Sequence, residues 1–209
     1  STALKGGEWR HIQDLRRSLG TTFKITLVTT SQHNKTDTIP IFKPTPWGLC
    51  QLWHFIYKHN FDLIHCHGYK ALTAIRLIKI MYPKCPPIIG TIHGFFLDYF
   101  PNKIKKWCQL TLERQLKTRQ DWTIFVSYSD QNAAIKARCI PPQKSSIIAN
   151  GIPFAKPTHA TTNTLVAPYY TAHNTPFICL FCGSLEHRKN PLLILESLYT
   201  LQQENKLEN

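Results

Sequence analysis

The sequence predicts an α/β protein built on a parallel sheet with helices on both faces. Short continuous apolar segments, typical of strands buried on both sides, alternate along the chain with segments of helical period. A hydrophobic content of 43% is sufficient for a core, and this composition, with only 18% charged residues, excludes a disordered chain and a coiled coil. The longest apolar runs, such as 177–182, are far shorter than the ~20 residues of a membrane-spanning helix.

The first third of the chain contains two predicted helices and two predicted strands. A helix is expected over 8–19, and Gly20 directly after it is expected to adopt a left-handed cap. The alternating, β-branched segment 23–29 predicts a strand. A Pro-rich loop over 31–48, a helix over 49–59 and a short buried strand over 62–67 follow.

The middle of the chain repeats the strand–helix order. Residues 70–81 predict a helix in which only a narrow stripe meets water, formed by Lys70, Thr73, Arg76 and Lys79. Strands are expected over 86–93, 122–127 and 146–150, with helices over 103–119 and 129–137 between them. The first of these helices, over 103–119, is basic, with Ile104, Trp107, Cys108 and Leu112 on one side.

The predicted organisation is a first domain over 1–152, a linker over 153–176 and the start of a second domain over 177–209. The linker segment is rich in Pro, Thr, His and Asn and shows little periodicity, whereas a strand over 177–182 and a helix over 191–203 follow it. A doubly wound sheet also requires a strand before the first helix, and residues 1–5 are too short and polar to supply it. The first strand is therefore expected to be missing and the chain to be a fragment or a processed product.

The seven cysteines cannot all pair internally and mostly lie in apolar runs, which indicates free, buried thiols in a reducing compartment. Cys179 and Cys182 form a CxxC pattern, but it lies in a predicted strand. No second pair follows at zinc-site spacing, so a zinc or redox site is not expected there.

Ligands of parallel α/β sheets bind at the carboxyl ends of the strands, where this sequence places 65–68, 93–96 and 150–151. His65 and His67 fall on one face of a strand, and His93 ends the next. A metal site is conceivable, but no third ligand is near in sequence, and structural histidines or a shared pocket are the other interpretations.

Two further segments have the chemistry of phosphate binding. Gly6 and Gly7 precede the first helix, whose free amides favour a phosphate, although a flexible turn is the better explanation of the two glycines taken alone. Arg188 and Lys189 lie in a predicted strand-to-helix loop. Two cations in such a loop fit a clamp for a diphosphate, and a solvated basic loop is the alternative interpretation.

Taken together, these motifs resemble glycosyltransferase family 4. The resemblance rests on six segments in order along nearly the whole chain: Gly-Gly-Glu-x-Arg-His at 6–11, Asp-Leu-Ile-His-Cys-His-Gly at 62–68, Thr-Ile-His-Gly-Phe at 91–95, Val-Ser-x-Ser at 126–129, Ile-Ala-Asn-Gly-Ile at 148–152, and Phe-x-Gly-x-Leu-x-x-x-Lys-Asn at 181–190. It implies the GT-B architecture, with two Rossmann-like domains and a cleft between them. It also implies retaining transfer of a sugar from a nucleotide diphosphate sugar, with no cofactor and no metal.

The resemblance also implies residue roles. His93, Lys189 and Arg188 would be catalytic, with His93 beside the transferring sugar and the cations neutralising the leaving diphosphate. The donor diphosphate would contact Gly6, Gly7, Ser184 and Lys189, and the acceptor-side pocket would contain His67, Gly94, Ser127, Asn150 and Gly151. Ser184 departs from the Arg that the family commonly carries there, and the paired glutamates of the family are absent.

The sequence leaves three functions open. The first is a glycosyltransferase, or its N-terminal part, that builds a surface glycan on a glycan or lipid-linked acceptor, in the cytoplasm or peripherally at the inner membrane face. The second is binding of a polyanion or an anionic membrane surface through the ten Lys and Arg of 69–119. No nucleic-acid motif accompanies this basic region, so nucleic acid is not an expected partner. The third is an inactive remnant.

Overall fold

The computed structural model describes residues 7–29, 42–43, 45–95, 102–151, 179, 181, 183, 185 and 189–204. The chain divides into two compact units, Ser1–Ile152 and Pro153–Asn209. The elements of the first unit are α1 (Gly7–Leu19), α2 (Pro46–His59), β1 (Ile64–His67), α3 (Gly68–Met81), β2 (Ile88–Ile92), α4 (Lys103–Leu116), the 3₁₀ turn η2 (Lys117–Arg119), β3 (Trp122–Phe125), α5 (Tyr128–Lys136), the 3₁₀ turn η3 (Pro142–Lys144) and β4 (Ser145–Ile147).

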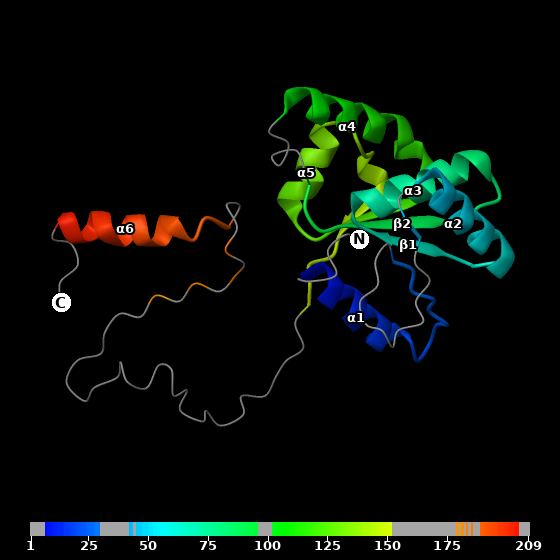
Figure 1. Ribbon diagram of the computed structural model, residues 1–209, viewed down its shortest axis with the longest axis horizontal. Coiled ribbons are helices and arrows are strands. Elements are labelled where there is room, and N and C mark those ends of the chain that lie inside the picture. The colour runs from blue at the N-terminus through cyan, green and yellow to red at the C-terminus, as the bar shows by residue number, and fades with distance from the viewer. Residues whose placement is uncertain are drawn as a thin grey trace. The chain divides into compact units, whose positions relative to one another are not determined.

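The four strands form a fully parallel sheet in the order β1-β2-β3-β4, which confirms the predicted fold class. Each crossover moves one strand along the sheet in the same direction. Right-handed crossovers then place α3, α4 and α5 on the same face. Figure 1 shows these three helices on one side of the sheet and α1 on the other. None of the helices in the described part of the chain has the length and hydrophobicity needed to cross a lipid bilayer.

The core lies between the sheet and α3. Leu72, Ile75 and Ile78 of α3 are buried against Ile88 and Ile92 of β2. The helix approaches β2 so closely at Gly90 that a Cβ atom there would lie 2.7 Å from Cδ2 of Leu72. Glycine at this position therefore permits the α3–β2 contact on which the rest of the unit is built.

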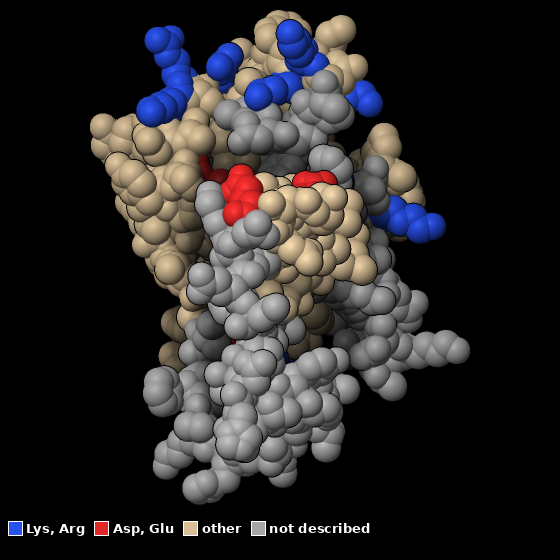
Figure 2. Space-filling view, turned by 90° about the vertical axis from the view of Figure 1, so that its left-hand side faces the viewer, with Lys and Arg blue, Asp and Glu red and all other residues tan. Residues whose placement is uncertain are grey.

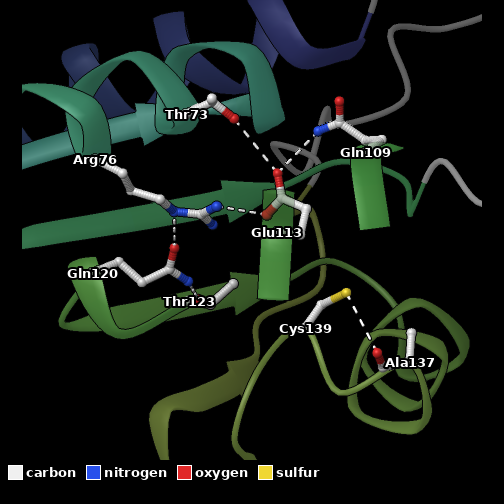
Figure 3. A network of polar contacts seen from close by, with 8 residues as sticks. All are labelled: Thr73, Arg76, Gln109, Glu113, Gln120, Thr123, Ala137 and Cys139. Atoms are coloured by element: carbon white, nitrogen blue, oxygen red, sulfur yellow. Dashed lines mark hydrogen bonds and ion pairs between the residues drawn. The ribbon is translucent and has the colours of Figure 1, made fainter. Parts of the chain in front are cut away.

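Figure 3 shows a buried polar network that joins α3 to α4 and to the start of β3. The Arg76 guanidinium donates to Oε2 of Glu113 at 2.5 Å and to Oε1 of Gln120 at 2.5 Å, and both Arg76 and Glu113 are at least 95% buried. The expectation that Arg76 belongs to a water-facing stripe is wrong. Its partner lies 37 residues away in sequence, so helical periodicity carries no sign of the pairing.

The strand expected over 23–29 is also wrong, because the structure shows only an isolated bridge at Thr29. Part of this segment lines a cavity of about 760 Å³ that is also lined by β1, the edge strand of the sheet. Residues 26–29 and 64–67 both line it, together with residues of α1, α2 and α3. Among the described residues, the backbone of segment 23–29 is joined to Phe42, whose amide donates to the Thr29 carbonyl at 3.0 Å, and the segment is not a strand of the sheet.

Smaller differences concern the ends of helices. α2 begins at Pro46 rather than at 49, because Thr45 caps it by accepting from the Gly48 amide at 3.1 Å and proline suits the first turn. Gly20 does not adopt a left-handed conformation. Instead, its amide donates to the Arg16 carbonyl at 3.0 Å, and a Cβ atom there would lie 2.5 Å from that oxygen.

The cysteines are only partly buried. Cys66, Cys85 and Cys139 are buried free thiols, as predicted, whereas Cys50, Cys108 and Cys179 are exposed free thiols. Desolvation raises the pKa of Cys66 to about 12, so this thiol stays protonated at neutral pH. Cys182 lies outside the described residues.

The second unit is described mainly by α6 (Leu192–Gln203), which matches the helix predicted over 191–203. The strand expected over 177–182 falls largely outside the described residues. α6 buries no residue, and its exposed apolar side chains include Leu192, Leu193, Leu195 and Tyr199.

Candidate functional site

A group of four histidines lies at the carboxyl ends of β1 and β2. The register pairs His65 with Ile89 and His67 with Thr91. Because side chains alternate along a strand, His65 and His67 share one face of the sheet with Thr91 and with His93, which follows the end of β2. This is the face opposite the one on which Gly90 contacts Leu72 of α3, and α1 lies on it (Figure 1).

The histidine rings contact one another directly. Nδ1 of His67 and Nε2 of His93 form a hydrogen bond at 3.2 Å, and Nε2 of His65 is 2.8 Å from the Thr91 hydroxyl. The fourth ring is that of His11 on α1, with its centroid 5.1 Å from that of His93 and 5.6 Å from that of His67. The prediction that His67 and His93 share a pocket is compatible with this arrangement, and His11 adds a ring from a distant part of the sequence.

Desolvation keeps the imidazoles of the pair neutral. It lowers the pKa of His67 to about 2, with further lowering from His65 and His93, and it lowers the pKa of His93 to about 4, helped by His11. A proton on any one ring would repel a proton on its neighbour, so the cluster disfavours charge. Each neutral ring can therefore donate one hydrogen bond and accept another at neutral pH.

α1 brings a carboxylate to the same place. The side chain of Glu8 lies against Gly68, where a Cβ atom would be 3.3 Å from Oε1 of Glu8. Gly68 has a φ of 74° at the start of α3, a left-handed conformation that glycine adopts readily. Among the described residues, Oε1 of Glu8 is a buried side-chain oxygen with no hydrogen-bond partner.

The loops after β2 and β3 are held together by α5. Ser127 caps α5 by accepting from the Asp130 amide at 3.2 Å, and its hydroxyl contacts that of Ser129 at 2.7 Å. Oδ1 of Asp130 in turn accepts from the Phe95 amide at 2.8 Å. One side chain thereby fixes the loop that carries His93.

The remaining predicted site residues are placed as follows. Gly94 follows His93, and a Cβ atom there would meet nothing within 4 Å. Asn150 and Gly151 follow β4 at the same edge of the sheet and are exposed. Gly7 is the exposed first residue of α1. Lys189 is exposed and belongs to the second unit, whereas Gly6, Ser184 and Arg188 lie outside the described residues.

Sequence reasoning missed His11 as a member of the site. The cluster that could hold a metal consists of His11, His67 and His93, whose ligand nitrogens all lie within 4.8 Å of one another. Local ligand spacing does not reveal this group, because the third ring comes from a helix more than fifty residues before His67. The one available signal was that His11 follows the Gly-Gly-Glu segment by one helical turn.

Comparison with known proteins agrees with this arrangement. The family model described as Glycosyltransferase Family 4 matches residues 5–156. The chain is also 26% identical over 155 residues to the UDP-Gal:alpha-D-GlcNAc-diphosphoundecaprenol alpha-1,3-galactosyltransferase of Escherichia coli, a match that covers 72% of this chain and 39% of the relative. The chain thus spans well under half the length of that enzyme. With the parallel sheet and the motif-bearing strand ends described above, the family match shows that this chain belongs to glycosyltransferase family 4.

Proposed function

We propose that this chain is the acceptor-side part of a retaining glycosyltransferase that transfers a sugar from a nucleotide diphosphate sugar to a glycan or lipid-linked acceptor. The observation that carries the proposal is the neutral His67–His93 pair at the carboxyl edge of the sheet. The curated relative, whose name gives a UDP-linked donor and a diphosphoundecaprenol-linked acceptor, supports this substrate class.

On this proposal His93 lies beside the transferring sugar and His67 orients it. A sugar hydroxyl needs partners that both donate and accept, and a neutral imidazole pair supplies both without the repulsion of two charges. The backbone at Gly94 leaves space beside His93. Ser127, Asn150 and Gly151, at the ends of the next two strands, complete the acceptor-side pocket.

The donor diphosphate is proposed to contact backbone amides at Gly6 and Gly7, where the N-terminus of α1 favours an anion. Lys189 and Arg188, with Ser184 nearby in sequence, would neutralise the charge that develops on the leaving diphosphate. Loss of one such partner costs roughly 10²–10³ in turnover. This is the expected effect of Lys189→Ala in any form of the protein that transfers sugar.

A second proposed contact is with an anionic membrane surface through α4, which would place the protein peripherally at the cytoplasmic face. Figure 2 shows Lys and Arg side chains gathered at the top of the molecule, where α4 lies in Figure 1. Ile104 and Trp107 are 72% and 64% exposed, next to Lys103, Lys105 and Lys106. The predicted apolar side of this helix thus faces outward, as interfacial helices require.

The test is acceptor binding by this chain, measured by saturation-transfer NMR with a short-chain prenyl-diphosphate N-acetylglucosamine. EDTA is present throughout, so that metals play no part. The proposal predicts sugar-ring contacts that are lost in His93→Ala and His67→Ala. They are retained in His54→Ala, a matched change of an exposed histidine on α2. Equal contacts in wild type and His93→Ala would overturn the proposed site.

A further inference from the structure

We propose that His11, His67 and His93 form a binding site for a divalent transition metal, with Zn²⁺ as the natural choice. Metal binding goes beyond the proposed sugar transfer. Because His67 and His93 also belong to the proposed acceptor pocket, a bound metal and a bound acceptor would exclude each other there. Three imidazoles are typical ligands of Zn²⁺, Cu²⁺ and Ni²⁺, whereas Mg²⁺ and Ca²⁺ prefer oxygen. Three protein ligands also leave a fourth position open for water or a small ligand.

The spacing of the nitrogens suits tetrahedral zinc. Zn–N bonds of about 2.0–2.1 Å at tetrahedral angles place two ligand nitrogens about 3.3–3.4 Å apart. Nδ1 of His67 and Nε2 of His93 are already 3.2 Å apart. The nitrogen of His11 lies within 4.8 Å of both, so a small side-chain rotation of one residue completes the set.

A bound metal takes the place of the hydrogen bond between the two rings. The covalent bond that breaks is an N–H bond. The proton shared by His67 and His93 moves, through solvent, to the outer nitrogen of the ring that carries it. Both inner lone pairs then face the metal, and the net charge of the ligands is unchanged. His65 stays outside the set, because its Nε2 is engaged by the Thr91 hydroxyl at 2.8 Å.

The buried Oε1 atom of Glu8 is a second observation that points to a cation. Within the described part of the chain, Oε1 of Glu8 has no hydrogen-bond partner, and Glu8 precedes His11 by three residues on the same side of α1. An unpaired buried carboxylate oxygen is costly, and a divalent cation close by offsets that cost. Carboxylates also orient histidine ligands by accepting from their outer N–H groups.

The site is carried by three separate elements that the fold already fixes. His11 is in α1, His67 ends β1, and His93 follows β2 on a loop held by Asp130. A metal therefore joins α1 to the sheet, and it should raise the thermal stability of the chain in proportion to its occupancy.

The experiment is titration of the full chain with Zn²⁺ by calorimetry and with Co²⁺ by visible absorption. A Cys50→Ser, Cys108→Ser, Cys179→Ser background removes the thiols that are exposed in the described part of the chain. We expect one metal per chain, tetrahedral Co²⁺ bands without thiolate charge transfer, and a higher melting temperature with Zn²⁺. His11→Gln should weaken binding by more than the ~10–100-fold that loss of an outer-shell partner costs.

Two controls keep the result independent of folding and of catalysis. His54→Gln should bind Zn²⁺ like the parent, and circular dichroism should show that His11→Gln keeps the fold. Absence of saturable binding by the parent chain, or unchanged affinity in folded His11→Gln and His93→Gln, would overturn the site. Because acceptor binding is measured in EDTA, failure of the metal site leaves the proposed function standing, and the converse also holds.

Discussion

At the scale of single residues, the histidines of the site link folding to pH. In the unfolded chain each titrates near 6.5, whereas the folded pKa is about 2 for His67 and about 4 for His93. Between pH 4 and 6.5 the unfolded state therefore binds more protons, so stability rises with pH and is lost as the pH falls through this window.

We predict that the free energy of unfolding, measured by urea denaturation in EDTA, falls by up to about 1.4 kcal/mol per pH unit for each of these histidines below pH 6.5. His93→Gln should reduce the slope of the free energy of unfolding against pH by the contribution of one proton, and His54→Gln should leave this slope unchanged. A pH profile for His93→Gln that coincides with wild type would contradict the desolvated state of this ring.

The buried ion pair is the second feature at this scale. Removing one partner leaves the other charged and buried without compensation, so Arg76→Met should cost about 3–5 kcal/mol in urea denaturation. The double variant Arg76→Met, Glu113→Leu should recover much of this loss, because it buries apolar groups instead. A loss below 1 kcal/mol for Arg76→Met would show that Glu113 is solvated.

The residues also show why sequence reasoning reached part of the site and not all of it. His67 and His93 were predicted to share a pocket because strand ends of a parallel sheet meet at one edge. Arg76 and His11 were misjudged or missed for one reason: each is defined by partners remote in sequence, Glu113 and His93 respectively. Local periodicity describes a helix face, but it does not say what packs against that face.

At the scale of elements, the sheet and the crossover helices were predictable because buried strands are continuous apolar runs and the helices between them are long and periodic. The absence of a strand over 23–29 was not predictable from the sequence, since a strand forms only where a neighbouring strand can exchange backbone hydrogen bonds with it. Residues 26–29 and β1 line the same cavity. About six residues is the usual length of a strand.

We therefore predict that six alternating Val and Thr residues fused ahead of Ser1 occupy this cavity in parallel with β1. The added strand would pair with both edges, raising the melting temperature and the denaturant m-value by the extra surface it buries. A Gly-Ser extension of equal length is the control. Equal melting temperatures for the two extensions would contradict this account of the cavity.

α4 carries the second prediction at this scale. Arg114 and Lys117 donate to the carbonyls of Ala137 and Arg138, whereas no ion pair of Lys103, Lys105 or Lys106 is found within the described ranges. Binding to anionic vesicles should thus depend on these three lysines, at roughly 1 kcal/mol each near the surface.

Vesicle co-sedimentation tests this prediction. Charge reversal at Lys103, Lys105 and Lys106 and higher salt should both release the protein, whereas charge reversal at Lys84, an exposed lysine before β2, is the matched control. Equal binding of wild type to neutral and anionic vesicles would refute an electrostatic contact.

At the scale of the whole molecule, the two units differ in what they can do alone. The first has a buried core and a defined polar site, whereas α6 in the second buries no residue and exposes Leu192, Leu195 and Tyr199. Exposed apolar surface of this kind promotes association. We expect this chain to associate through its second unit, and Leu192→Glu, Leu195→Glu to reduce that association in analytical ultracentrifugation.

The central proposal is that this chain supplies the acceptor side of a glycosyl transfer, and that residues 177–209 bind the donor weakly by themselves. Positioning and charge stabilisation act only when both substrates are held together. Isothermal titration of the chain with a panel of UDP- and GDP-sugars, in parallel with the lipid-linked N-acetylglucosamine analogue, tests this most directly. We predict saturable binding of the acceptor analogue, weak or no binding of every nucleotide sugar, and no transfer when both are present. Tight binding of a nucleotide sugar, or any sugar transfer by this chain, would contradict the claim.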